Sequence, residues 1–62
     1  MTLSTKEFIT TIISNEIKRV TKLMGFIKDE KDQNTCGTYI VICKQSIQEL
    51  NEIKVEELPP QG

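Results

Sequence analysis

Apolar residues in the first half of the chain recur with the period of an α-helix. When residues 4–24 are placed at about 100° per residue, the large apolar side chains fall on one arc of roughly 180°, and polar residues fill the other half. This separation predicts a long amphipathic helix over residues 4–24. The apolar arc comprises Phe8, Ile9, Ile12, Ile13, Ile17, Val20, Leu23 and Met24.

Local signals indicate where this helix begins and ends. Ser4 followed three residues later by Glu7 has the spacing of a capping box, in which each side chain accepts a hydrogen bond from a free backbone N–H of the first turn. Gly25 suits the left-handed position that often follows the last helical residue. The helix is therefore predicted to start at Ser4 and to stop near Met24.

The apolar arc is wider than one packing surface needs, and it contains Glu16. A helix lying on one surface needs a stripe of roughly 100° or a little more. In one interpretation Glu16 lies at an exposed rim, with Arg19 as its partner. In the other, Glu16 divides the arc: Phe8, Ile12 and Leu23 meet the chain's own strands, and a second chain covers a dimer interface of Ile9, Ile13, Ile17, Val20 and Met24.

A coiled coil is the less favoured interpretation of the same residues. The spacing of alternately three and four residues runs through Gly25 and lasts too few heptads to sustain a coiled coil on its own. This line of positions comprises Ile13, Ile17, Val20, Met24 and Ile27.

The second half of the chain predicts a β-hairpin. Residues 38–43 are β-branched or aromatic almost throughout, which favours a strand, and residues 26–28 are its predicted partner across a polar loop. The run is apolar on both faces, and its edge would be exposed in a monomer. Pairing across a two-fold axis would cover that edge, so Tyr39 and Val41 are further candidates for a dimer interface.

Residues 46–57 are predicted as a short helix or strand. Ser46 and Glu49 have the spacing of a second capping box, whereas alternation over residues 53–58 favours a strand. The prolines after it end regular structure, so residues 59–62 are expected to be frayed. The expected fold is a single small α+β domain over residues 1–62.

The length of the chain favours association. A chain of 62 residues buries only about 60% of its unfolded surface, and its net stability comes out near zero without a disulfide, a metal or a partner. Only three residues are aromatic and none is Trp. The thin core is the main reason to expect a homodimer.

Charge is distributed unevenly although the net charge is only −1. Residues 1–28 carry five basic and two acidic side chains, whereas residues 45–62 carry one basic and four acidic ones. The small basic group of Lys18, Arg19, Lys22 and Lys28 would bind nucleic acid only weakly. The acidic group is either a solvated face or a docking surface for a basic protein, and comprises Glu49, Glu52, Glu56 and Glu57.

Residues with reactive chemistry are scarce. The chain has no His, and its two cysteines, Cys36 and Cys43, cannot complete a zinc site within one chain. The acidic loop after Lys28 lacks the glycine and the final glutamate of a calcium loop. No catalytic residue, metal site or cofactor is predicted. The absence of a secretory signal or apolar span leads us to expect a cytoplasmic location without membrane contact.

These features together predict a non-enzymatic protein that acts by binding another protein, as a homodimeric inhibitor or adaptor. The excess of Ile over Leu and of Lys over Arg is typical of AT-rich genomes, so a phage or a low-GC bacterium is the expected source. Two alternatives remain open: a small DNA-binding transcriptional regulator, and a structural or assembly component.

Overall fold

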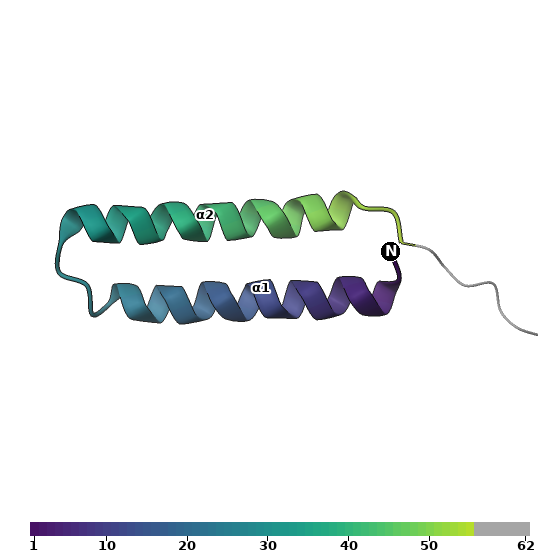
Figure 1. The fold of residues 1–62 in the computed structure, drawn as a ribbon, viewed down its shortest axis with the longest axis horizontal. Coiled ribbons are helices and arrows are strands. Elements are labelled where there is room, and N and C mark those ends of the chain that lie inside the picture. Colours follow the sequence, from purple (N-terminus) through teal and green to yellow (C-terminus); the bar gives the residue numbers. More distant parts are fainter. Residues whose placement is uncertain (56–62) are drawn as a thin grey trace, which may run out of the picture.

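Residues 1–55 fold into two α-helices. The computed structural model describes residues 1–55, which contain α1 (Leu3–Met24) and α2 (Glu30–Glu52). The helices have 22 and 23 residues, so each is roughly 33–35 Å long. They run antiparallel and side by side, joined by residues 25–29 at one end (Figure 1). The fold is a helical hairpin, and neither helix is long and apolar enough to cross a membrane.

The predicted α+β fold is wrong, because residues 1–55 contain no strand. Residues 26–28 lie in the connection, and residues 38–43 lie inside α2. Of the segment 46–57, predicted as a short helix or strand, the part up to Glu52 is the end of α2, while its last two residues and the tail 59–62 lie outside the described residues. The N-terminal amphipathic helix is confirmed to within one residue at its start.

Residues 38–43 are helical because packing overrides their β propensity. Their buried or half-buried members, Ile40 and Cys43, belong to a line along α2 that alternates in steps of three and four residues, the spacing of one helix face. The apolar sequence of residues 38–43 is continuous because it also contains Tyr39, Val41 and Ile42, but these three side chains are exposed and lie off the line. The complete line is Gln33, Cys36, Ile40, Cys43, Ile47 and Leu50.

The side chains of α1 that pack against α2 follow the same alternation. The coiled-coil spacing that the sequence analysis disfavoured is therefore the packing line of this helix, and it reaches Ile27 beyond Gly25. Within the described residues only Val20, Cys43 and Leu50 are buried. The packing line of α1 comprises Lys6, Thr10, Ile13, Ile17, Val20, Met24 and Ile27.

The first helix is capped by Thr2 rather than by Ser4. The Thr2 hydroxyl oxygen accepts a hydrogen bond from the backbone N–H of Thr5 at 3.2 Å, so the predicted capping box is wrong. At the other end Gly25 has φ −64°, which is right-handed and not the left-handed conformation predicted for it. The chain leaves α1 through i→i−3 hydrogen bonds, such as Phe26 N–H to the Leu23 carbonyl at 2.9 Å.

Asp29 begins α2, and side chains fasten both ends of the hairpin. The Asp29 carboxylate accepts from the backbone N–H of Lys31 at 3.0 Å. The Gln33 side chain donates to the Ile27 carbonyl at 2.6 Å, which ties the first turn of α2 to the connection. At the open end the Lys6 ammonium donates to the carbonyl of Asn51 at 3.4 Å, and so binds one of the free carbonyls that end α2.

Ser46, predicted to begin a helix, instead lies within α2. Its hydroxyl donates to the Ile42 carbonyl at 3.0 Å, one turn back. Thr35 and Thr38 make the same kind of bond to Lys31 and Asn34. Because these hydroxyls are satisfied by the helix's own carbonyls, β-branched and hydroxylated residues are accommodated in α2.

Candidate protein-binding face

The two helices form a single layer that has two open faces. Successive residues of a helix lie about 100° apart, so the side chains that flank each packing line can be assigned to one face or the other. We call one of them the apolar face. It carries six large apolar side chains, Ile9, Ile12 and Leu23 from α1 and Tyr39, Ile42 and Ile53 from α2 or its cap.

The opposite side of the layer, which we call the polar face, has a different composition. Two exposed large apolar residues belong to this side: Leu3, which lies beside Glu7 and Thr11 in the first turns of α1, and Val41 on the outer part of α2, which neighbours Ile42 in the sequence. Val41 and Ile42 are both 52% exposed, although they lie on opposite sides of the hairpin. The polar face comprises Glu7, Thr11, Ser14, Thr21, Gly37 and Lys44.

The apolar face exposes several large apolar side chains to solvent. Ile12 and Leu23 are about half exposed, and so are Ile42 and Tyr39 on the other helix. Phe8 on α1 and Phe26 in the connection are exposed as well, Phe26 at 76%. Several large apolar side chains exposed on one face are typical of a surface that binds another protein.

An ion pair lies in the middle of the apolar face. The Arg19 guanidinium donates to both carboxylate oxygens of Glu16, at 2.8 and 3.1 Å. The hydrogen bond to Glu16 is the main reason why the pKa of Arg19 is raised. Glu16 thus has Arg19 as its partner, as one of the two interpretations expected. The other interpretation is wrong in its assignment of the two sides, because residues 1–55 contain no strand for Phe8, Ile12 and Leu23 to meet.

Tyr39 of α2 lies across from this ion pair. Its pKa is raised above the usual 10.0, first by the side chain of Cys43 one turn further on and then by burial. Glu16 raises the same pKa and Arg19 lowers it, so both charges of α1 act on a residue of α2. The phenol is therefore a reporter of contact between the two helices.

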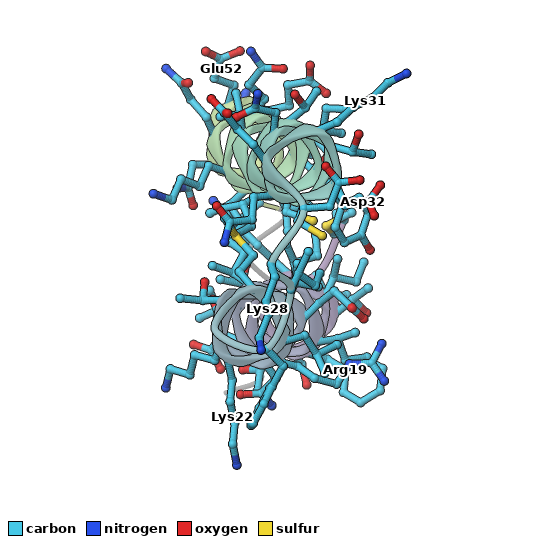
Figure 2. The ribbon with its side chains drawn as sticks, turned by 90° about the vertical axis from the view of Figure 1, so that its left-hand side faces the viewer. Arg19, Lys22, Lys28, Lys31, Asp32 and Glu52 are labelled. Carbon is cyan, nitrogen blue, oxygen red and sulfur yellow. The ribbon has the colours of Figure 1, made fainter. Side chains whose placement is uncertain are left out.

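Opposite charges gather on the two helices at the connection. Arg19, Lys22 and Lys28 lie around the end of α1, as Figure 2 shows for the view onto this end of the hairpin. The first turn of α2 carries Glu30 and Asp32, whose negative charges interact favourably with the positive end of the helix dipole. As a whole α1 carries four basic and two acidic side chains, a net charge of +2, and α2 carries two basic and four acidic ones, a net charge of −2.

Most of the residues predicted for a dimer interface face the chain's own second helix. Val20 is buried, and the other candidates from the first helix are half-buried. Tyr39 lies on the apolar face, whereas Val41 lies on the other side of the hairpin. The structure therefore does not bring the predicted set together. The half-buried candidates are Ile9, Ile13, Ile17 and Met24.

The acidic candidates for partner binding are described only in part. Glu49 and Glu52 are exposed near the end of α2. Glu56 and Glu57 lie outside the described residues. Ile42 and Ile53 were not among the predicted site residues. Ile42 lies three residues from Tyr39, which is the spacing of one helix face, whereas Ile53 lies eleven residues beyond Ile42, with no member of the apolar face between them.

Other candidate chemistry is limited in residues 1–55. No group of three or more His, Cys, Asp and Glu side chains in this range could hold a metal ion. An open groove of about 400 Å³ lies beside the first turns of α1. Lys6 lines this groove, but its ammonium already donates a hydrogen bond to the Asn51 carbonyl. Both cysteines are free thiols.

A DNA-binding helix-turn-helix also consists of two helices joined by a short turn, and α2 follows α1 after a five-residue connection. The helices nevertheless lie antiparallel, not at the steep angle of that DNA-binding motif (Figure 1). No family model, curated protein or solved structure matches the chain.

Proposed function

We propose that this chain is a small non-enzymatic protein that acts by protein–protein binding through its apolar face. The observation that carries the proposal is the difference between the two faces of the layer. Large apolar side chains from both helices lie on one face, beside Thr35, Ser46 and the Glu16–Arg19 pair, while the other face carries mainly hydroxyl and charged groups, with the exposed Leu3 at its end.

The size of the hairpin supports the same proposal. Each side chain that packs between the two helices has neighbours from one other helix only, and just three side chains are buried within residues 1–55. Domains commonly consist of two packed layers of secondary structure, and residues 1–55 of this chain supply one. Covering the apolar face would provide the second layer.

Binding of nucleic acid has less support. The basic side chains near the connection stand within one or two turns of Asp29, Glu30 and Asp32, which reduce the positive potential that a polyanion would meet. The net charge of the whole chain is −1. We therefore retain protein binding as the single proposed function.

Photo-crosslinking tests this proposal with a matched pair of positions. A benzophenone amino acid replaces either Ile42, on the apolar face, or its neighbour Val41, and cells that produce the chain are irradiated. We expect protein adducts from position 42 that do not form from position 41 and that are lost when Ile12→Lys is added. Equal adducts from both positions, or none from position 42, would contradict the proposal.

A further inference from the structure

We infer that the apolar face is covered by a second copy of the chain, so that two hairpins form a four-helix bundle with both connections at the same end. The inference rests on the proposed function, because it identifies the protein that the face binds. It is carried by the size of the face and by the distribution of charge on the two helices.

The area of the face fits a specific dimer. A layer of two helices that is roughly 33 Å long and about 20 Å wide has a projected area of roughly 660 Å². Accessible area exceeds projected area because side chains make the surface uneven. The face is therefore comparable in size with the roughly 800 Å² that each partner contributes to an interface of standard size.

A second hairpin also supplies the contacts that the first one lacks. In a four-helix bundle each helix has two neighbours, and side chains beside the original packing line turn inward. Ile9 and Tyr39, which flank this line on the apolar face, would become core residues. Two-fold dimers are the commonest closed assembly of identical chains, and each copy would cover the face of the other.

Charge decides between the two ways of stacking the hairpins about a two-fold axis. If both connections lie at the same end, α1 of each chain lies over α2 of its partner. If they lie at opposite ends, each helix lies over its own copy. Since α1 has a net charge of +2 and α2 a net charge of −2, the first arrangement pairs unlike helices and the second pairs like ones.

The side chains near the helix ends sharpen this choice. Arg19 near the end of α1 and Asp32 in the first turn of α2 lie on the same side of the hairpin (Figure 2), so that with both connections at the same end Arg19 of one chain approaches the acidic first turn of the partner's α2. With the connections at opposite ends, Asp32 would approach the acidic last turns of the partner's α2, which contain Glu49. Like charges placed together disfavour the second arrangement.

Sedimentation equilibrium of the purified chain tests the occupant. We expect a dimer whose dissociation constant rises at least about tenfold in Ile42→Lys, because a buried ammonium without a partner is costly. Val41→Lys is the matched control, since both residues are 52% exposed on adjacent positions of α2, and it should leave the constant unchanged. A helical monomer at every concentration, or equal losses in both variants, would overturn the inference.

Distance measurement tests the orientation and does not depend on the folding of Ile42→Lys. A spin label is attached to Lys28→Cys in a chain whose two cysteines are replaced by Ala and whose helicity is verified by circular dichroism. Helices that pack 8–10 Å apart place the two labels about 15–25 Å from each other when both connections share one end. A distance above roughly 33 Å, the length of a helix, would contradict that orientation.

The outcomes also separate this inference from the proposed function. A purified chain that stays monomeric, while position 42 still forms adducts with other proteins in cells, would overturn the second copy as occupant and leave protein binding in place. A chain that neither dimerises nor forms adducts would overturn both.

Discussion

The guanidinium of Arg19 binds both carboxylate oxygens of Glu16 within one turn of α1, at 2.8 and 3.1 Å. The two side chains differ in solvent contact, because Glu16 is 28% exposed and Arg19 is 70% exposed. The carboxylate thus lies among the apolar side chains of its face, while the guanidinium extends toward water. The pair brings a neutralised polar group to the centre of an otherwise apolar face.

Titration of Tyr39 reports on this arrangement. The chain has one Tyr and no Trp, so ultraviolet absorbance follows a single phenol. We expect a pKa above 10.0 in the folded protein, because the Cys43 side chain, burial and Glu16 all disfavour the phenolate. Cys43→Ala should lower the pKa most, whereas Arg19→Gln should raise it further because Arg19 favours the phenolate.

The same shift has a consequence for stability. A phenol whose pKa is higher in the folded than in the unfolded chain stabilises the fold fully below the unfolded pKa, and this contribution is lost as the pH rises through the folded pKa. The free energy of unfolding measured in urea should therefore fall as the pH rises above about 10. Tyr39→Phe is the control, and its stability should lack this component of the alkaline dependence.

Much of α1 could be predicted from the sequence, because its apolar residues keep one period over 21 residues and its end is marked by glycine. Its start was misplaced by one residue, since Thr2 and Ser4 both have side chains that can cap a helix. Composition alone could not decide which of the two would do so.

Residues 38–43 were misassigned for a different physical reason. In this segment Val41 and Ile42 are apolar but exposed, so that the packing line through Ile40 and Cys43 was hidden among neighbours of equal hydropathy. The period appears only when the line is followed in both directions to Gln33 and Leu50. The apolar face was missed because its members come from two helices whose relative position the sequence does not contain.

Helix caps provide a direct test of the corrected boundaries. Asp29→Ala removes the carboxylate that binds the Lys31 N–H, and should lower the free energy of unfolding by about 1 kcal/mol. Ser4→Ala should change it by less than about 0.5 kcal/mol, because Ser4 is exposed within α1 and does not cap it. Chemical denaturation of the two variants and the wild type gives both values. A larger loss in Ser4→Ala would restore the predicted capping box.

Gly37 offers the opposite kind of change, a gain in stability. It lies in the middle of α2, and a Cβ atom added there would meet nothing within 4 Å. Gly37→Ala should therefore raise the free energy of unfolding by about 0.5–1 kcal/mol, since alanine loses less backbone entropy than glycine in a helix. Thermal unfolding followed by circular dichroism measures the gain.

A matched control for this substitution is Gly25→Ala at the end of α1. Its backbone is also right-handed, but the added Cβ would lie 3.3 Å from the Lys22 carbonyl oxygen. The crowding should make its gain smaller than that at Gly37. A loss of stability in Gly37→Ala would contradict the open surroundings of this residue and would indicate that another surface packs against the polar face.

The two thiols should differ in reactivity although both lie on the packing line of α2. Cys36 is half-buried and Cys43 is buried, so Ellman's reagent should modify Cys36 first in the native protein. They are separated by seven residues of one helix, a rise of about 10.5 Å, which exceeds the roughly 7 Å that a disulfide can span between Cα atoms. Oxidation of the native chain should therefore leave no bond between them.

The Cys36→Ser variant isolates Cys43, whose modification should be slow in buffer and fast in denaturant. Fast modification of Cys43 in buffer would show that the helices separate readily, which the packing of Val20, Cys43 and Leu50 argues against.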